Sequence, residues 1–409
     1  MTLNVSYMGT KRQLADQVAD VIALSADGPL LDLFAGMCAV GSAVAPDRNV
    51  WCNDVQWFAS TVARSFFTSD GRPLDRETCE ELLEEPFEEN RDALIQRFRA
   101  HLNRENEALT AASVQRFRAS DAAMPNCGTS LYFDKERRRL TTNKCEFPYR
   151  LFSITYAGGY FGLQQAIDID SIRYAIDTRL KTRQITTEQH RWLLIGLCQA
   201  ASKVANTTGH FAQYLKVKST NIRRLARQRE RSIYGEWLAC IEEMKPLGTK
   251  RWRQGNEVTK SDAVKLLKEM AKKEGKLPAV IYADPPYTDD QYSRYYHLYE
   301  TLILYDYPES KGMGRYRPDR FVSLFSSKQS VEKEMKLLVE GVAHLGSDIV
   351  ISYPGNGLLS DTKNTLRQLI KSSYNHCNII EIDHRHSSLG ASKGVQKHSV
   401  TEMLFRGYN

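Results

Sequence analysis

The 409-residue sequence lacks the cysteine patterns of a structural zinc site or a disulfide framework. Its eight cysteines are scattered without a Cys-x-x-Cys pair, which favours a reducing compartment. The sequence also lacks a long apolar run: its most apolar helical stretch, residues 192–201, is too short to span a bilayer. No signal-peptide pattern follows the first methionine. We therefore expect a cytoplasmic protein that needs no metal and no membrane.

The composition is otherwise ordinary and leans basic. Hydrophobic residues make up 42% and charged residues 26% of the sequence, as in globular proteins with a sizeable core. The formal net charge is +7, which agrees with a polyanionic partner without requiring one. A length of 409 residues allows two or three domains, or one domain with a large insertion.

The first part of the sequence alternates between strand and helix patterns before a long helical region begins. Residues 29–34 predict a buried strand, residues 35–41 a glycine turn that starts a helix, and residues 50–54 a second strand. From about residue 60 to 250, charged amphipathic helices such as 91–111 dominate, and strand-like alternation is sparse. This change of character predicts a second domain inserted into an α/β domain.

The α/β pattern resumes near Glu257. Helices are expected at residues 263–273, 331–345 and 364–374, and strands at 279–283 and 348–353. A closing hairpin is expected at residues 378–384 and 399–405. We therefore predict an α/β fold: an open, largely parallel sheet with a C-terminal antiparallel hairpin, plus an inserted, mainly helical domain. The predicted limits are residues 1–62 and 255–409 for the sheet domain and 63–254 for the insertion.

The most informative motif is Asp284-Pro285-Pro286-Tyr287, which follows a short apolar strand. Proline has a fixed φ and no N–H, so the neighbouring carbonyl groups are held rigidly and point outward. A carboxylate and a carbonyl oxygen can both accept from an exocyclic NH2 group and keep its lone pair aimed at an electrophile. Since the tyrosine ring can stack on a flat heterocycle, the motif favours chemistry on a base amine. An ordinary Pro-Pro turn is the alternative.

A second group of residues suits a nucleoside-type cofactor. Asp32-Leu-Phe-Ala-Gly36 forms a strand-to-helix turn in which Gly36 lets a ligand approach the backbone closely. Asp54 closes the second strand, where an acid can accept from both ribose hydroxyls. The glycines form no Gly-x-Gly-x-x-Gly motif, so a dinucleotide is less favoured. We predict cofactor contacts from Asp32, Phe34, Gly36 and Asp54.

Three further residues are candidate cofactor contacts. Tyr7 and Lys11 surround a glycine, so the lysine could meet a cofactor carboxylate and the ring could stack on its base. A solvated surface lysine is the ordinary alternative. Asp262 lies where a third strand should end and a helix begin. It is either a helix N-cap or an acceptor for the cofactor's adenine amine, and the two roles are compatible.

Four motifs occur in an order that resembles the D12 class of DNA adenine-N6 methyltransferases, which includes the Dam-like enzymes: Tyr7-x-Gly-x-Lys11, Asp32-Leu-Phe-Ala-Gly36, Asn53-Asp54 and Asp284-Pro-Pro-Tyr287. The resemblance implies a Rossmann-like, S-adenosylmethionine-dependent methyltransferase sheet, with cofactor contacts at Tyr7, Lys11, Asp54 and Asp284. It also implies the α-group arrangement, in which the insertion holds the target-recognition domain. Tyr7 departs from the tryptophan that Dam-type enzymes often carry, and the insertion is longer than in Dam, so no target sequence can be transferred.

The implied reaction is direct, in-line methyl transfer from S-adenosylmethionine to N6 of adenine in double-stranded DNA. Asp284 and the Pro285 carbonyl would accept the two amine hydrogens, while Tyr287 stacks on a base that has been flipped out of the duplex. The predicted catalytic residues are Asp284, Pro285, Pro286 and Tyr287. The sequence has no Pro-Cys dipeptide, which disfavours C5-cytosine methylation.

Three alternatives remain at this stage, together with one further expectation. The same pocket could serve an N4-cytosine or an RNA amino methyltransferase. The chain could also be an inactive DNA-binding protein on the same fold. A restriction endonuclease is expected as a possible partner.

Basic residues predict the nucleic-acid contacts. The strongest basic cluster lies between residues 216 and 231, and phosphate contacts need such charge. A solvated helix face is the usual alternative for a charge run. Residues 135–139 are a shorter second candidate. Residues 289–297 are rich in tyrosine and form either a packed amphipathic helix or part of the target contact. The predicted DNA-binding residues are Lys216, Lys218, Arg223, Arg224, Arg227, Tyr292 and Arg294.

Overall fold

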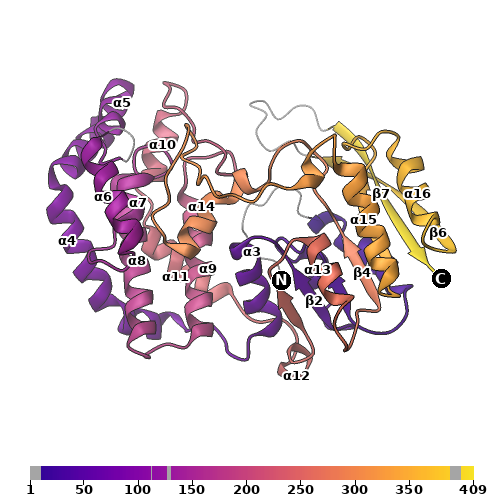
Figure 1. Cartoon of the computed structure of the whole chain (residues 1–409). Helices are drawn as coiled ribbons and strands as arrows, with labels where there is room; N and C mark the ends of the chain where they lie inside the picture. Colours follow the sequence, from indigo (N-terminus) through magenta and orange to yellow (C-terminus); the bar gives the residue numbers. More distant parts are fainter. Residues whose placement is uncertain (1–10, 112, 127–129, 387–397) are drawn as a thin grey trace.

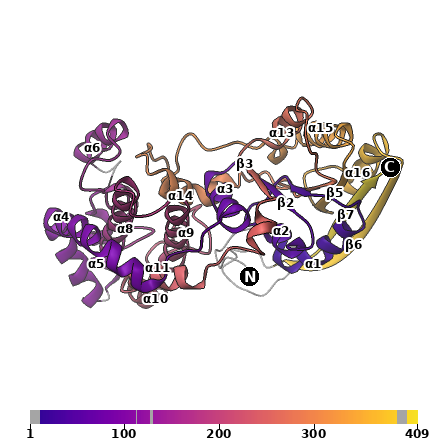
Figure 2. The same ribbon diagram turned by 90° about the horizontal axis from the view of Figure 1, so that it is seen from below.

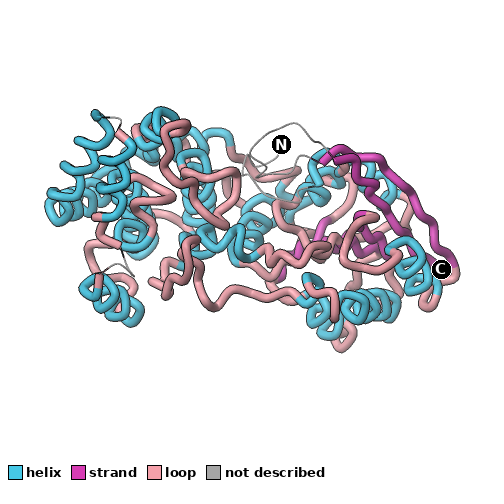
Figure 3. The backbone as a smooth tube through the Cα atoms, turned by 90° about the horizontal axis from the view of Figure 1, so that it is seen from above, coloured by secondary structure: helices cyan, strands magenta, loops and turns pink. Residues whose placement is uncertain are grey.

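The computed structural model describes residues 11–111, 113–126, 130–386 and 398–409, so Tyr7 lies outside the described residues. The molecule is elongated, with a β-sheet at one end and a group of helices at the other (Figure 1, Figure 3). The C-terminus lies at the outer edge of the sheet end (Figure 1).

A seven-stranded sheet is formed in the described part of the chain, in the order β3-β2-β1-β4-β5-β7-β6. The strands from β3 to β5 in this order are parallel, whereas β7 pairs antiparallel with both β5 and β6. The strands are β1 (Leu30–Asp32), β2 (Val50–Asn53), β3 (Glu257–Thr259), β4 (Val280–Ala283), β5 (Asp348–Pro354), β6 (His376–His386) and β7 (His398–Tyr408). The predicted α/β fold, with a largely parallel sheet and a closing antiparallel hairpin, is confirmed.

Helices cover both faces of the sheet (Figure 2). One face carries α1 (Ala15–Ala23), α2 (Ala39–Val44) and α3 (Trp57–Ala63), and the other carries α13 (Ala263–Met270), α15 (Val331–His344) and α16 (Thr362–Lys371). Successive strand residues point to opposite faces. Leu30 therefore enters the first core and Leu31 the second. A sheet that is covered on both faces leaves the strand ends as the place for a site.

The helical end is formed mainly by the chain between β2 and β3. Its elements are the π-helix η2 (Arg64–Thr68), α4 (Arg76–Ala111), α5 (Val114–Ala122), α6 (Leu131–Thr142), α7 (Leu151–Thr155), α8 (Leu163–Lys181), α9 (Thr187–Val204), α10 (Ile222–Arg229) and α11 (Ile233–Glu243). The short α12 (Lys250–Arg253) lies at the sheet end instead, where Trp252 donates to the Arg48 carbonyl oxygen just before β2 (Figure 1). Trp192 on α9 and Leu30 on β1 belong to one buried cluster, so the core runs from the helical end to the sheet. Among the described helices, none combines the length and apolar character that crossing a membrane requires.

The helix that follows the Asp-Pro-Pro-Tyr motif, α14 (Ser293–Leu304), also packs on the helical end. Tyr299 stacks on Phe58 of α3 at a centroid distance of 4.4 Å, and His297 Nε2 lies 3.0 Å from the carbonyl oxygen of Phe211. The interpretation of residues 289–297 as a packed helix therefore holds from Ser293 onward. The side chains of this helix pack on α3 and on the helical end.

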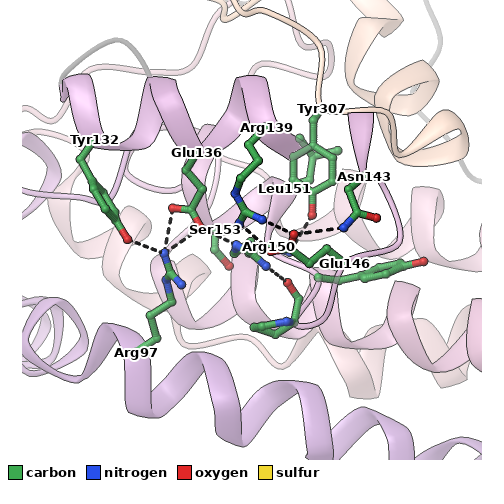
Figure 4. Close-up of polar contacts among 12 residues, drawn as sticks. Arg97, Tyr132, Glu136, Arg139, Asn143, Glu146, Arg150, Leu151, Ser153 and Tyr307 are labelled. Carbon is green, nitrogen blue, oxygen red and sulfur yellow. Dashed lines mark hydrogen bonds and ion pairs between the residues drawn. The ribbon is translucent and has the colours of Figure 1, made fainter. Parts of the chain in front are cut away.

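Residues after α14 strengthen this connection. The hydroxyl of Tyr305 donates to Asp170 at 2.6 Å, and the Arg315 guanidinium donates to the carbonyl oxygens of Thr155, Ala157 and Gly158. Figure 4 shows Tyr307 reaching the polar network around Glu146 and Arg150, where its hydroxyl accepts from the Arg150 backbone N–H at 3.1 Å. The segment then returns to the sheet through the 3-10 helix η3 (Leu324–Ser326). The helical end is thus built from two segments of the chain, and the limits of the inserted domain stay a prediction.

Candidate active site

Acidic residues gather where the parallel strands end. Asp32 ends β1, Asp54 follows β2, Asp262 follows β3 and Asp284 follows β4. Because these strands are parallel neighbours, their carboxyl ends meet at one edge of the sheet. The four carboxyl groups consequently line one pocket, which encloses about 1050 Å³ including the part open to solvent.

The pocket brings together most of the predicted site. The predicted residues that line it are Lys11, Asp32, Phe34, Gly36, Asp54, Asp262, Asp284, Pro285, Pro286, Tyr287 and Tyr292. The short η1 helix (Lys11–Gln13) supplies the lysine. Arg294 is not among the described lining residues: its side chain is 43% exposed and its guanidinium lies over the Tyr295 ring. Within the described residues, no group of three or more His, Cys, Asp or Glu side chains is placed to hold a metal ion.

Asp54 fixes the shape of the glycine turn. Its Oδ2 accepts from the Gly36 N–H at 3.0 Å and its Oδ1 accepts from the Gln56 N–H at 2.8 Å. Gly36 has a φ of 48°, in the left-handed region that glycine adopts without strain. A carboxylate offers about four lone-pair sites, so each oxygen of Asp54 can accept a further hydrogen bond from a ligand.

Aromatic and polar groups form the opposite wall. The Phe34 ring meets the Phe325 ring edge-on at a centroid distance of 5.4 Å. Asp262 is the N-cap of α13, because its Oδ1 accepts from the Lys265 N–H at 3.0 Å, and it also lines the pocket. The prediction that Asp262 is an N-cap is confirmed. Its contact with the cofactor stays a prediction.

Lys11 lies between two carboxylates beside the Asp-Pro-Pro-Tyr motif. Its Nζ is 3.2 Å from Asp284 Oδ1 and 2.8 Å from Glu402 Oε1, and 5.6 Å from the centroid of the Tyr287 ring. Lys11 is buried, which removes the alternative of a solvated surface lysine. Burial by itself would lower the pKa of Lys11, but attraction to Asp284 and Glu402 outweighs it and raises the pKa.

Burial raises the pKa values of three carboxyl groups in the pocket, those of Asp284, Asp32 and Asp54. Burial raises the pKa of Asp284 to about 7, opposed by Lys11 and assisted by Glu402. Burial, with repulsion from Asp284, raises the pKa of Asp32 to about 8. Burial also raises the pKa of Asp54, although hydrogen bonds from Gln56 and Gly36 act against it. Such displaced pKa values in a cleft are typical of functional sites.

The raised pKa of Asp32 predicts a pH-dependent stability. The pKa of an aspartate in an unfolded chain is about 3.9. Between this pH and about pH 8, Asp32 therefore keeps its proton in the folded protein but has lost it in the unfolded chain. Stability contributed by Asp32 therefore falls as the pH rises through this window. We expect the melting temperature of Asp32→Asn, relative to that of the wild type, to increase as the pH rises from 5.5 to 8. The measurement is thermal unfolding followed by circular dichroism without ligand. Asp27→Asn, at an exposed position, should track the wild type, and parallel curves for Asp32→Asn and the wild type would contradict the prediction.

The side chains of the predicted basic cluster, on α10 and on the chain just before it, lie either on a buried face or on an exposed face. Arg229 turns inward, with its guanidinium 2.7 Å from Asp121 and 3.4 Å from Glu105. The other predicted bases are exposed: Lys216, Lys218, Arg223, Arg224 and Arg227. None of these exposed bases is among the described pocket-lining residues. They form a separate surface, which we call the α10 basic face.

The second basic candidate, residues 135–139, has one buried base, Arg137, whereas Lys135, Arg138 and Arg139 are exposed and stay candidate DNA contacts. Glu136 is buried and accepts from Arg97 and Arg150 at 2.7 and 2.6 Å, and Arg137 is buried as well. Arg139 donates to Glu146 (Figure 4). This segment therefore ties α6 to its neighbours.

Three site residues were not predicted from the sequence. Phe325 comes from η3, which reaches the pocket only after the excursion through the helical end. Glu300 of α14 accepts from the Trp57 and Phe58 N–H groups at 3.1 and 2.6 Å, and so fixes the start of α3 next to Asp54. Glu402 is an acid inside the apolar pattern of β7, and that interruption was the available sequence signal.

The sequence is similar to those of known methyltransferases. The type II methyltransferase M.FokI of Planomicrobium okeanokoites is 25% identical over 371 residues, which are 90% of this chain and 46% of that protein. The type II methyltransferase M.NlaIII of Neisseria lactamica is 28% identical over 202 residues, 49% of this chain and 53% of that protein. The chain thus spans about half the length of these relatives. The sequence pattern of D12 class N6 adenine-specific DNA methyltransferases matches residues 7–234 and 249–386. The chain therefore belongs to the D12 class of N6 adenine-specific DNA methyltransferases.

Proposed function

We propose that this chain transfers a methyl group from S-adenosylmethionine to N6 of adenine at specific sites in double-stranded DNA. The observation that carries the proposal is the placement of Asp284 and the Pro285 carbonyl in one pocket with the strand-end acids Asp32 and Asp54. Family membership supplies the reaction class, and the proposed donor-binding acids and the Asp-Pro-Pro-Tyr motif line the same pocket.

The pocket residues fit the methyl donor chemically. Asp54 has lone pairs left for ribose hydroxyls, and Phe34 offers an aromatic face for an adenine ring. Asp262 can accept from an adenine amine, and Gly36 allows close approach to the backbone. The predicted contact by Tyr7 falls outside the described residues. S-adenosylmethionine, when bound, supplies an electrophilic methyl group.

The Asp-Pro-Pro-Tyr motif would hold the target amine. Asp284 and the Pro285 carbonyl accept its two hydrogens, which keeps the nitrogen lone pair free and stabilises the positive charge that develops on nitrogen. Pro286 keeps this turn rigid, and Tyr287 stacks on the base. Because N6 is enclosed in a duplex, the adenine must leave the stack to reach the pocket.

The helical end would hold the DNA. We assign target recognition to the inserted region, residues 63–254, and phosphate contacts to the α10 basic face, with Tyr292 and Arg294 beside the base pocket. Two relatives are named type II methyltransferases and another is named modification methylase LlaI, so a restriction endonuclease is the partner that we propose. The proposed compartment is the cytoplasm, where the host DNA lies.

The test is the methylation state of DNA from cells that express this chain. We expect N6-methyladenine at one sequence context by methylation-aware sequencing, and labelled methyl transfer from S-adenosylmethionine to duplex DNA by the purified protein. Mass spectrometry of nucleosides from DNA and RNA of the same cells separates the alternatives. N4-methylcytosine, methylated RNA or the absence of any modified base would overturn the proposal.

A further inference from the structure

Glu402 is a buried acid on the hairpin strand β7, next to the proposed catalytic motif. Its side chain is 1% exposed and its Oε1 lies 2.8 Å from Lys11 Nζ. The hydroxyl of Ser352, on the neighbouring strand β5, donates to the same oxygen. Oε2 has no hydrogen-bond partner within the part of the chain that the structure describes. An acid in such a position is costly to bury, so its contacts need an explanation beyond packing.

Lys11 couples Glu402 to Asp284 electrostatically, because its ammonium group contacts both carboxylates. The ammonium group lies between the two carboxylates: it donates a hydrogen bond to Glu402 Oε1, and it forms an ion pair with Asp284, whose Oδ1 is 3.2 Å away. This leaves Oδ2 of Asp284 for the amine of a base. If Glu402 were neutral, Lys11 would be attracted only to Asp284, and the Asp284 carboxylate would be a weaker acceptor for any other donor.

We propose that Glu402 is a positioning residue for methyl transfer: through Lys11 it orients Asp284 and keeps its carboxylate free to hold the target amine. This inference rests on the proposed function. Glu402 itself touches neither base nor donor, since it is not among the described pocket-lining residues. The antiparallel hairpin, which completes the sheet, thus contributes to the chemistry as well as to the fold.

The charge on Glu402 also affects the proton affinity of Asp284. Asp284 interacts electrostatically with titratable groups from η1, β1, β4, the segment after β4, and β7. These groups are Lys11, Asp32, Tyr282, Tyr287, Tyr292 and Glu402. Glu402 raises the pKa of Asp284, whereas Lys11 lowers it. Loss of the Glu402 charge therefore lowers the pKa of Asp284, and its ionisation moves to lower pH.

The test compares Glu402→Gln with Glu402→Asp in the full-length protein, using kcat and KM for duplex DNA between pH 5.5 and 9. For Glu402→Gln we expect the acid limb, which is the rise of kcat with pH at the acidic end of the profile, to shift to lower pH by about half a unit or more. The plateau kcat should fall about 10-fold, and KM for DNA should change less than about 2-fold. Glu402→Asp, which keeps the charge, should retain the wild-type limb and lose only part of kcat. Glu381→Gln, an exposed position on β6, is the matched control and should match the wild type.

Three outcomes overturn the inference. The first is a Glu402→Gln variant with the wild-type limb and kcat. The second is an equal loss in Glu402→Gln and Glu402→Asp together with an equal drop in melting temperature, which would reveal a structural role alone. If Glu402→Gln does not fold, Ser352→Ala replaces it, with an expected loss in kcat of about 3-fold at unchanged KM, and an unchanged kcat is the third outcome.

A second readout separates this inference from the proposed function. If the wild type transfers no methyl group, the proposed function fails, but the coupling of Glu402 to Asp284 is still measured by thermal unfolding without ligand. The fall in melting temperature between pH 6 and 8.5 should be smaller in Glu402→Gln than in the wild type, because the pKa of Asp284 is raised less. Equal pH dependence of the two proteins overturns the coupling.

Discussion

Replacing Asp284 by asparagine is expected to reduce methyl transfer at least about 100-fold while the affinity for duplex DNA stays within about 3-fold of the wild type. Asparagine has a single acceptor oxygen, and its NH2 group would face either Lys11 or the substrate amine as a second donor. It also removes the negative charge that stabilises the positive charge developing on the amine nitrogen. The rate is measured in single turnovers with a labelled methyl donor, and DNA affinity by fluorescence anisotropy.

Asp289→Asn is the matched control for this substitution. Asp289 lies five residues further along the chain, is exposed and is not among the described pocket-lining residues. It should retain the wild-type rate. An active Asp284→Asn variant would refute the role of Asp284 in holding the amine, whereas a parallel loss of DNA affinity would show that Asp284 supports the fold instead. If the wild type and Asp284→Asn bind DNA equally and neither methylates it, the chain is an inactive DNA-binding protein.

The sheet could be predicted from the sequence because its strands are short apolar segments that end at an acid or at a turn. Residues 348–353 were predicted as a strand, and β5 spans Asp348–Pro354. The longest helix was predicted too short: residues 91–111 form only the second part of α4, which starts at Arg76 and includes Pro86. Proline usually ends a helix, so local pattern does not predict a helix that continues across Pro86. Packing of Leu83 and Phe87 into the core stabilises that turn instead.

The pocket was predictable in part. The ends of parallel strands meet, so Asp32, Asp54 and Asp284 could be placed together without knowing the packing. The apolar pattern of β7 marks Glu402 as unusual, but its place beside Lys11 depends on the hairpin, and the place of Phe325 depends on the return of the chain from the helical end. Local pattern carries no information about such long-range placement.

The apolar spacing within the basic cluster predicts which face of α10 is buried. Ile222, Leu225, Ala226 and Arg229 recur at helical spacing, and all four are buried. That period already marks Arg229 as inward-facing, and the structure pairs it with Asp121 and Glu105. The remaining arginines of α10, Arg223, Arg224 and Arg227, point to solvent. They form no ion pair within the described part of the chain, so their charge is available for a partner.

Removing Arg223, Arg224 and Arg227 together by alanine substitution should weaken DNA binding about 100-fold at low salt, with little change in melting temperature. These side chains are exposed, so their loss affects neither the α10 core contacts nor the pocket. The dependence of log affinity on log salt should become less steep by about 0.9 for each phosphate contact that is lost. Anisotropy titrations at several salt concentrations measure both quantities.

The matched control removes three exposed lysines from another surface, as Lys265→Ala, Lys268→Ala and Lys272→Ala in one protein. Both triple variants lower the net charge by the same amount, so a general charge effect would weaken DNA binding equally. A larger loss from the arginine variant assigns the contact to the α10 basic face, because both variants remove three exposed positive charges. Equal losses, or an unchanged salt dependence in the arginine variant, would show that these arginines are a solvated helix surface and that the DNA lies elsewhere on the helical end.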